Sequence, residues 1–133
     1  MKKILLLSCL FLLGACGGDA VNADGGSSSS EGRLDVAAFV QALEVSPDAQ
    51  LIDVRTPDEC RAGVLANSTN LNYHGSQFEE QLAQLSKDKP VFVYCQSGGR
   101  SAKTYYRLKK LGHSKVYEMK GGYRAWEQLY GEK

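Results

Sequence analysis

The chain has 133 residues, with 16 Lys or Arg side chains against 15 Asp or Glu, so its formal net charge is +1 at pH 7. Such a small net charge, with no basic stripe and no basic patch interleaved with aromatic residues, excludes recognition of nucleic acid through bulk charge. The four cysteines include no CxxC pair and no His-rich spacing, and this pattern argues against a metal site.

The first 15 residues predict a secretory signal peptide. A short basic start precedes an apolar run over residues 4–13, and small residues lead up to Cys16. The run is too short for a permanent membrane span, which needs about 20 residues. Its end resembles the lipobox of bacterial lipoproteins, and this resemblance implies that Cys16 is lipidated and becomes the first residue of the mature chain. An ordinary secreted protein with a chance cysteine is the alternative.

Lipidation of Cys16 implies a protein of the bacterial cell envelope that faces the periplasm and is held at a membrane by its lipid. Gly17 stands where an inner-membrane retention signal usually has Asp, which favours the outer membrane. Residues 16–32 contain almost no apolar side chains, so we expect them to form a flexible tether. The expected organisation is a signal peptide over 1–15, a lipidated tether over 16–32 and one folded domain over 33–130.

The folded part alternates between strand and helix patterns. Short apolar runs predict strands over residues 51–54, 70–73, 90–94 and 116–119. Helical spacing of apolar residues predicts helices over residues 35–43, 101–111 and 123–130. Capping boxes predict two further helices, one opened by Thr56 and Glu59 and ended by Gly63, the other opened by Ser76 and Glu79. This alternation predicts an α/β fold with a mainly parallel central sheet and helices on both faces.

The strand over residues 90–94 runs directly into a loop with the residue types of an anion-binding site. The loop reads Cys95, Gln96, Ser97, Gly98, Gly99, Arg100 and Ser101. In parallel sheets, ligands bind beyond the carboxyl ends of the strands, which is where Cys95 stands. Two glycines let successive backbone amides point inward, and a helix that begins near Arg100 aims its positive end at the same place. Both features favour a thiolate, so Cys95 is the predicted nucleophile.

Three polar side chains of the loop are candidates for contact with a substrate. Arg100 carries a fixed positive charge and planar donors, which can pair with an oxyanion or brace the loop. The hydroxyl groups of Ser97 and Ser101 can donate hydrogen bonds to a sulfur anion. The loop is therefore suited to an anionic sulfur species.

A strand followed by Cys-x-Ser-Gly-x-Arg-Ser and then a helix resembles the active-site loop of single-domain rhodaneses, and the likeness extends over nearly all of residues 33–130. Two other motifs support it. Asp53-Val54-Arg55 followed by Glu59 resembles the Asp-x-Arg…Glu segment of that family, and residues 121–126 resemble its closing Gly-Gly…Trp motif. The resemblance implies a rhodanese-like fold and the activity of a thiosulfate sulfurtransferase.

The family's chemistry implies roles for these residues. Cys95 would take a sulfane sulfur from thiosulfate or a similar donor and pass it, as a persulfide, to cyanide or a thiol. Arg100 and the loop would bind the donor, and no cofactor is needed. Asp53 and Arg55 would order the neighbouring loop through hydrogen bonds and an ion pair with Glu59.

Several alternatives remain open at this point. Rhodanese-like phosphatases have five residues between the Cys and the Arg, whereas four separate Cys95 from Arg100 here, which favours sulfur over phosphate chemistry. A carrier or sensor that holds persulfide without turnover is a further alternative. Cys60 is either a small thiol that packs its helix on the sheet or a redox partner that forms a reversible disulfide with Cys95. His74 and His113 are expected on loops, facing solvent.

Overall fold

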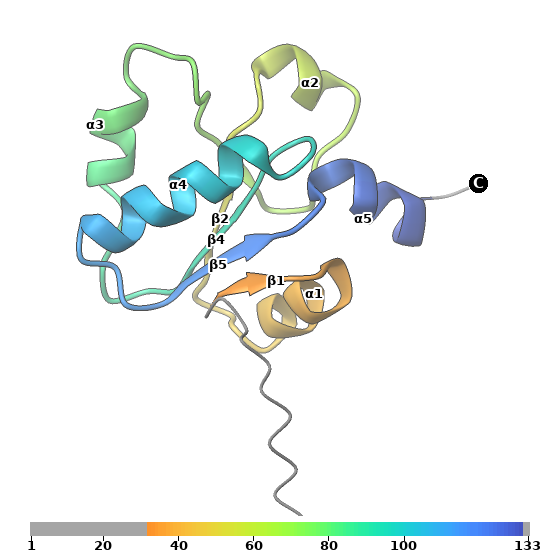
Figure 1. Cartoon of the computed structure of the whole chain (residues 1–133), viewed down its shortest axis with the longest axis horizontal. Helices are drawn as coiled ribbons and strands as arrows, with labels where there is room; N and C mark the ends of the chain where they lie inside the picture. Colours follow the sequence, from red (N-terminus) through yellow and green to blue (C-terminus); the bar gives the residue numbers. More distant parts are fainter. Residues whose placement is uncertain (1–31, 132–133) are drawn as a thin grey trace, which may run out of the picture.

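The strands form one parallel sheet in the computed structural model, which describes residues 32–131 (Figure 1). The strand order is β1-β5-β4-β2-β3, and every neighbouring pair is parallel. The strands are β1 (Arg33–Leu34), β2 (Gln50–Asp53), β3 (Thr69–Asn70), β4 (Val91–Tyr94) and β5 (Val116–Met119). The predicted α/β fold with a parallel central sheet is confirmed.

Helices cover both faces of the sheet, as the sequence predicts (Figure 1). They are α1 (Val36–Glu44), α2 (Pro57–Arg61), α3 (Phe78–Ala83), α4 (Gly99–Lys110) and α5 (Gly122–Tyr130). One apolar cluster joins α3 and α4 to the sheet, and a second cluster joins α1 and α5 to its other face. Within residues 32–131, no helix is long and apolar enough to cross a bilayer.

Strand β4 shows how the sheet positions the nucleophile. Its side chains alternate between the two apolar clusters, with Val91 and Val93 on the α4 face and Phe92 and Tyr94 on the α1 face. The same alternation puts Cys95, the next residue, on the α4 face at the carboxyl end of the sheet. Fully buried apolar residues on both faces explain why this segment reads as a continuous apolar run in the sequence.

Two helix starts test the capping-box predictions. The first is confirmed: Thr56 accepts a hydrogen bond from Glu59 N at 3.3 Å, and the Glu59 carboxylate accepts one from Thr56 N at 2.9 Å. The second is wrong, because α3 begins at Phe78 without a side-chain cap, and Ser76 lies outside it. A turn replaces the cap, since Phe78 N donates to the Gly75 carbonyl at 3.2 Å.

Three other expectations need correction. The edge strand β1 has no counterpart among the predicted elements, and β3 is limited to Thr69–Asn70 instead of residues 70–73. Strands of two residues are too short to show a period in the sequence. His74 is exposed, as expected, but His113 is buried, and within residues 32–131 neither of its ring nitrogens has a hydrogen-bond partner. Its loop folds back on α4, where His113 N donates to the Leu108 carbonyl at 3.1 Å.

Candidate active site

The loop after β4 folds back onto the sulfur atom of Cys95. The Cys95 side chain is 1% exposed. Gly98 N–H donates to Cys95 Sγ at 3.1 Å. Gly98 has φ +100, a backbone conformation that residues other than glycine rarely adopt. Gly98 is also the N-cap of α4, so the helix begins one residue after the amide that contacts the sulfur. The predicted placement of Cys95 beside a helix N-terminus is therefore found in the structure.

The start of α5 determines which way the loop's peptide groups point. Tyr123 N donates to the Cys95 carbonyl at 2.7 Å, and Arg124 N donates to the Gln96 carbonyl at 3.1 Å. None of the described peptide bonds is cis, and in a trans peptide the N–H points opposite to the C=O. The N–H groups of Gln96 and Ser97 therefore point away from α5, and neither has an acceptor within residues 32–131.

These amides and the first N–H groups of α4 form a set of donors around the loop. Gly99 N and Arg100 N also lack an acceptor in the part of the chain that the structure describes, as is general for the first turn of a helix. Unpaired backbone donors gathered in one short loop favour an anion, and they do so without a charged side chain. The loop can therefore stabilise the negative charge of a thiolate or a persulfide.

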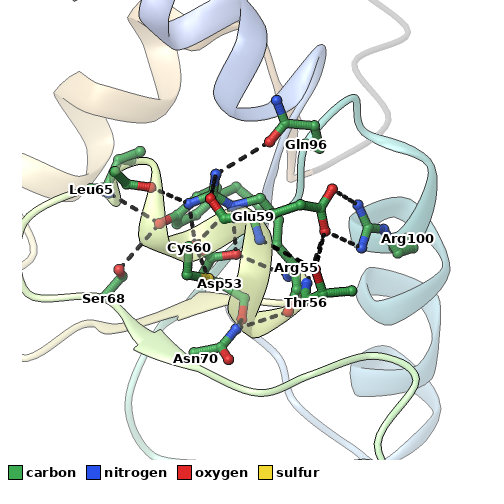
Figure 2. A network of polar contacts seen from close by, with 12 residues as sticks. Asp53, Arg55, Thr56, Glu59, Cys60, Leu65, Ser68, Asn70, Gln96 and Arg100 are labelled. Carbon is green, nitrogen blue, oxygen red and sulfur yellow. Dashed lines mark hydrogen bonds and ion pairs between the residues drawn. The ribbon is translucent and has the colours of Figure 1, made fainter.

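Arg100 of α4 is held by Glu59 of α2 (Figure 2). Its two terminal nitrogens donate to the two carboxylate oxygens at 2.8 and 2.7 Å. The Arg100 hydrogen bond is the largest of the causes that lower the pKa of Glu59 to about 2. The predicted ion pair between Arg55 and Glu59 is wrong: Glu59 pairs with Arg100, and α2 is thereby linked to α4. The role of Arg100 toward a substrate stays a prediction.

Arg55 instead pairs with Asp53, and both side chains are buried. Arg55 Nη2 lies 2.7 Å from Asp53 Oδ2, and Nη1 donates to the Gln96 side-chain oxygen at 3.2 Å (Figure 2). The Arg55 guanidinium also stacks 4.2 Å from the centre of the Tyr123 ring, at the start of α5. This one side chain connects β2, the loop after β4 and α5. The supporting role of Asp53 and Arg55 toward that loop stays a prediction.

Cys60 lies in the same network and is half-buried. Its thiol donates to Asp53 Oδ2 at 3.4 Å. Burial and the Asp53 charge raise the pKa of Cys60 to about 11, so it remains a thiol at neutral pH. Both Cys60 and Cys95 are free in the structure, and the reversible disulfide between them stays a prediction.

Ser101 differs from its predicted role. Its buried hydroxyl donates to the Glu118 carboxylate at 2.7 Å, and its hydrogen is thus used inside the protein instead of facing a substrate. Glu118 in turn pairs with Arg33 at 2.9 Å. Sequence reasoning missed both charged residues, although a Glu inside the apolar run Val116–Met119 is a signal for a buried carboxylate with a partner. Ser97 and Gly99 are exposed, and their binding roles stay predictions.

A cavity of about 320 Å³ opens beside the loop. It is lined by Arg55, Glu59, Ala62, Gln96, Tyr123 and Glu127. Within residues 32–131, no group of three or more His, Cys, Asp or Glu side chains is arranged to hold a metal ion. The predicted lipidation site, Cys16, lies outside the described residues.

Comparisons with known proteins agree with this geometry. A family model described as a rhodanese-like domain matches residues 36–129. The chain is 38% identical over 78 residues to the uncharacterized protein YqhL of Bacillus subtilis; the match covers 59% of this chain but only 60% of YqhL, less than two thirds of its length. It is 31% identical over 94 residues to a sulfurtransferase of Allochromatium vinosum, covering 71% of this chain and 86% of the relative.

A thiosulfate sulfurtransferase, GlpE of Pseudoalteromonas translucida, is 30% identical over 101 residues, which covers 76% of this chain and 93% of GlpE. Among solved structures, a rhodanese-related protein from Thermoplasma volcanium matches with a TM-score of 0.65 at 28% identity, covering 75% of this chain and 94% of that chain. The sequence comparisons and the fold comparison thus agree on a rhodanese-like protein.

Proposed function

The chain belongs to the rhodanese-like domain family, and from this premise we propose that it is a sulfurtransferase that carries sulfur on Cys95. The donor is thiosulfate or a similar sulfane compound, and the acceptor is cyanide or a thiol. Relatives that bear the name sulfurtransferase support this class of reaction. The observation that carries the proposal is the hydrogen bond from Gly98 N–H to Cys95 Sγ, inside a loop whose free amides suit an anionic sulfur.

The reaction proceeds in two displacements at sulfur. The Cys95 thiolate attacks the outer sulfur of thiosulfate, a new S–S bond forms, and the old S–S bond breaks as its electron pair leaves with sulfite. Cyanide then attacks the terminal sulfur of the persulfide, and the electron pair of the broken S–S bond returns to Cys95 as thiocyanate departs. Both steps keep the negative charge on sulfur, where the loop amides stabilise it.

Arg100 favours sulfur over phosphate chemistry in this loop. A phosphate cradle needs an Arg whose planar donors are free to grip two oxygens of the anion. Here both terminal nitrogens of Arg100 are bonded to Glu59. The donor that contacts Cys95 Sγ is instead a backbone amide, that of Gly98, and this suits a single sulfur atom.

The test is thiosulfate-dependent formation of thiocyanate by the reduced full chain, beside Cys95→Ser and Cys60→Ser. We expect multiple turnover in the wild type and in Cys60→Ser, and none in Cys95→Ser. Mass spectrometry after thiosulfate alone should show one added sulfur, of 32 Da, on the peptide that contains Cys95. Absence of both turnover and sulfur loading in the wild type refutes the proposal.

A carrier that holds persulfide without fast turnover is the second candidate. The near-complete burial of Cys95 favours it, because a sulfur that is 1% exposed is hard for a bulky acceptor to reach. Loading of one sulfur on Cys95 without thiocyanate formation distinguishes this candidate from the enzyme. A disulfide mechanism through Cys60 is less well supported, since a thiol whose pKa is about 11 is a poor attacking group at neutral pH.

We also propose that the domain is held at the bacterial envelope by a lipid on Cys16, with the outer membrane as the favoured location. The basis is the sequence pattern of residues 1–17. Metabolic labelling with a radioactive fatty acid tests it: label in the wild type and none in Cys16→Ser is expected. Equal labelling of both, or of neither, contradicts the proposal.

A further inference from the structure

A buried carboxylate lies next to the catalytic loop. Glu118 of β5 is fully buried, and its Oε1 accepts the hydrogen bond from the Ser101 hydroxyl. The same oxygen lies 3.7 Å from the place that a Cβ would take on Gly98. Because Gly98 N–H is the donor to Cys95 Sγ, the Glu118 charge is close to the sulfur that has to carry a negative charge.

Arg33 supplies the counter-charge for this carboxylate. Its Nε donates to Glu118 Oε2 at 2.9 Å, so one carboxylate oxygen faces Arg33 and the other faces Ser101. The hydrogen bond to Glu118 is the main cause that raises the pKa of Arg33, which therefore stays protonated. Arg33 lies on the edge strand β1, with its side chain 28% exposed. The pair is electrically neutral as long as Arg33 is in place.

On the premise that Cys95 is the sulfur carrier, we propose that Arg33 is a positioning residue that acts through Glu118: it cancels the carboxylate charge and thereby allows a thiolate or persulfide to form on Cys95. Without Arg33, an uncompensated negative charge stands beside the loop, and like charges disfavour each other in a buried site. The Glu118 oxygen that accepts the hydrogen bond from the Ser101 hydroxyl is still present after this change, so the first turn of α4 keeps its bond to β5. The effect of losing Arg33 is thus electrostatic.

The test measures the reactivity of the Cys95 thiol directly. Methyl methanethiosulfonate is small and uncharged, and its reaction with Cys95 in the full chain is followed by mass spectrometry of the Cys95 peptide. We expect Arg33→Gln to slow this reaction on the order of tenfold. Glu118→Gln keeps an acceptor for Ser101, and in the double variant it should restore the rate to within about twofold of wild type. Arg107→Gln, which breaks the exposed pair between Arg107 of α4 and Glu79 of α3, is the matched control and should react like wild type.

The double variant separates charge from structure. A merely structural role of Arg33 predicts that removing both partners is at least as harmful as removing one, whereas the charge argument predicts rescue. If Arg33→Gln unfolds, Arg33→Lys and the double variant, both of which avoid the unpaired carboxylate, still report the effect. An unchanged rate in Arg33→Gln, or a double variant as slow as the single one, overturns the inference.

The readout is independent of sulfur turnover. Slow modification in Arg33→Gln together with rescue supports the inference even where the wild type forms no thiocyanate, in which case only the proposed function fails. Conversely, a fully active sulfurtransferase whose Cys95 reacts equally fast with and without Arg33 leaves the proposed function intact and removes this role of Arg33.

Discussion

Replacing Gly122 by Ala should disable the catalytic loop more severely than it destabilises the fold. Gly122 has φ +65, and an added Cβ would overlap the Cys95 carbonyl oxygen and lie 2.7 Å from both Gln96 C and Ser97 N. Ordinary contact begins near 3.4 Å, so the loop or the start of α5 must move by about 1 Å to relieve the overlap with the carbonyl oxygen. The loop's peptide groups are then no longer held by the amides of α5.

The expected magnitudes differ for stability and activity. A side chain in the left-handed region costs about 1–2 kcal/mol, which lowers Tm by roughly 10 °C in a domain of this size. A displacement approaching 1 Å at a reacting group reduces turnover on the order of 100-fold. We therefore expect Gly122→Ala to remain folded and to lose nearly all thiocyanate formation.

Gly99→Ala is the matched control for this experiment. Gly99 lies in the catalytic loop itself, yet no heavy atom lies within 4 Å of the place where its Cβ would be, and its φ is not positive. Turnover and thermal melting are measured for both variants. If Gly122→Ala turns over like wild type, or if Gly99→Ala loses as much activity, the argument that α5 orients the loop is wrong.

Three further predictions concern side chains around the site and the core. The pKa of Glu59 falls from 4.5 to about 2 on folding, so its pair with Arg100 stabilises the protein above pH 4.5 and loses this effect as the pH falls toward 2. In urea unfolding, Glu59→Gln should therefore lower the free energy of unfolding by about 1 kcal/mol at pH 7 and by almost nothing near pH 2. Burial, and secondarily Lys87, lower the pKa of His113 below its usual 6.5, so stability should drop as the pH falls below 6.5, and His113→Phe should flatten the Tm profile between pH 7 and 5. Cys60, with its pKa raised to about 11, should react with iodoacetamide at pH 8 only slowly, and rapid labelling would contradict the assigned hydrogen bond to Asp53.

The parts of the site that are local in sequence were predictable. The strand β4, the loop after it and the start of α4 form one continuous segment, whose apolar run, two glycines and helix pattern each leave a signal in the sequence. The capping box at Thr56 and Glu59 is equally local, since its two bonds join residues three positions apart. Such features depend on backbone geometry over a few residues, and residue types report that geometry directly.

The pairing of charges was not predictable in the same way. Glu59 has Arg55 four positions before it and Arg100 41 positions after it in the sequence. It pairs with Arg100 because α2 and α4 lie close together in the fold. Arg33 and Glu118 are 85 positions apart, and β1 has only two residues. No periodic pattern marks either partner, so the register between β1 and β5 determines their contact.

Arginine side chains and backbone N–H groups have different roles around this loop. Arg55 and Arg100 are both bonded to carboxylates: Arg55 pairs with Asp53 at the end of β2, and Arg100 pairs with Glu59 and thereby joins α4 to α2. The donor that contacts Cys95 Sγ is the backbone N–H of Gly98, and the directions of the Gln96 and Ser97 N–H groups depend on the hydrogen bonds from α5 to the loop carbonyls. On the proposed function, such a site would hold a negative charge on one small atom and select little else about the sulfur donor. Selection of the acceptor would then depend on the surroundings of the loop, where the cavity lined by Gln96 is a candidate surface.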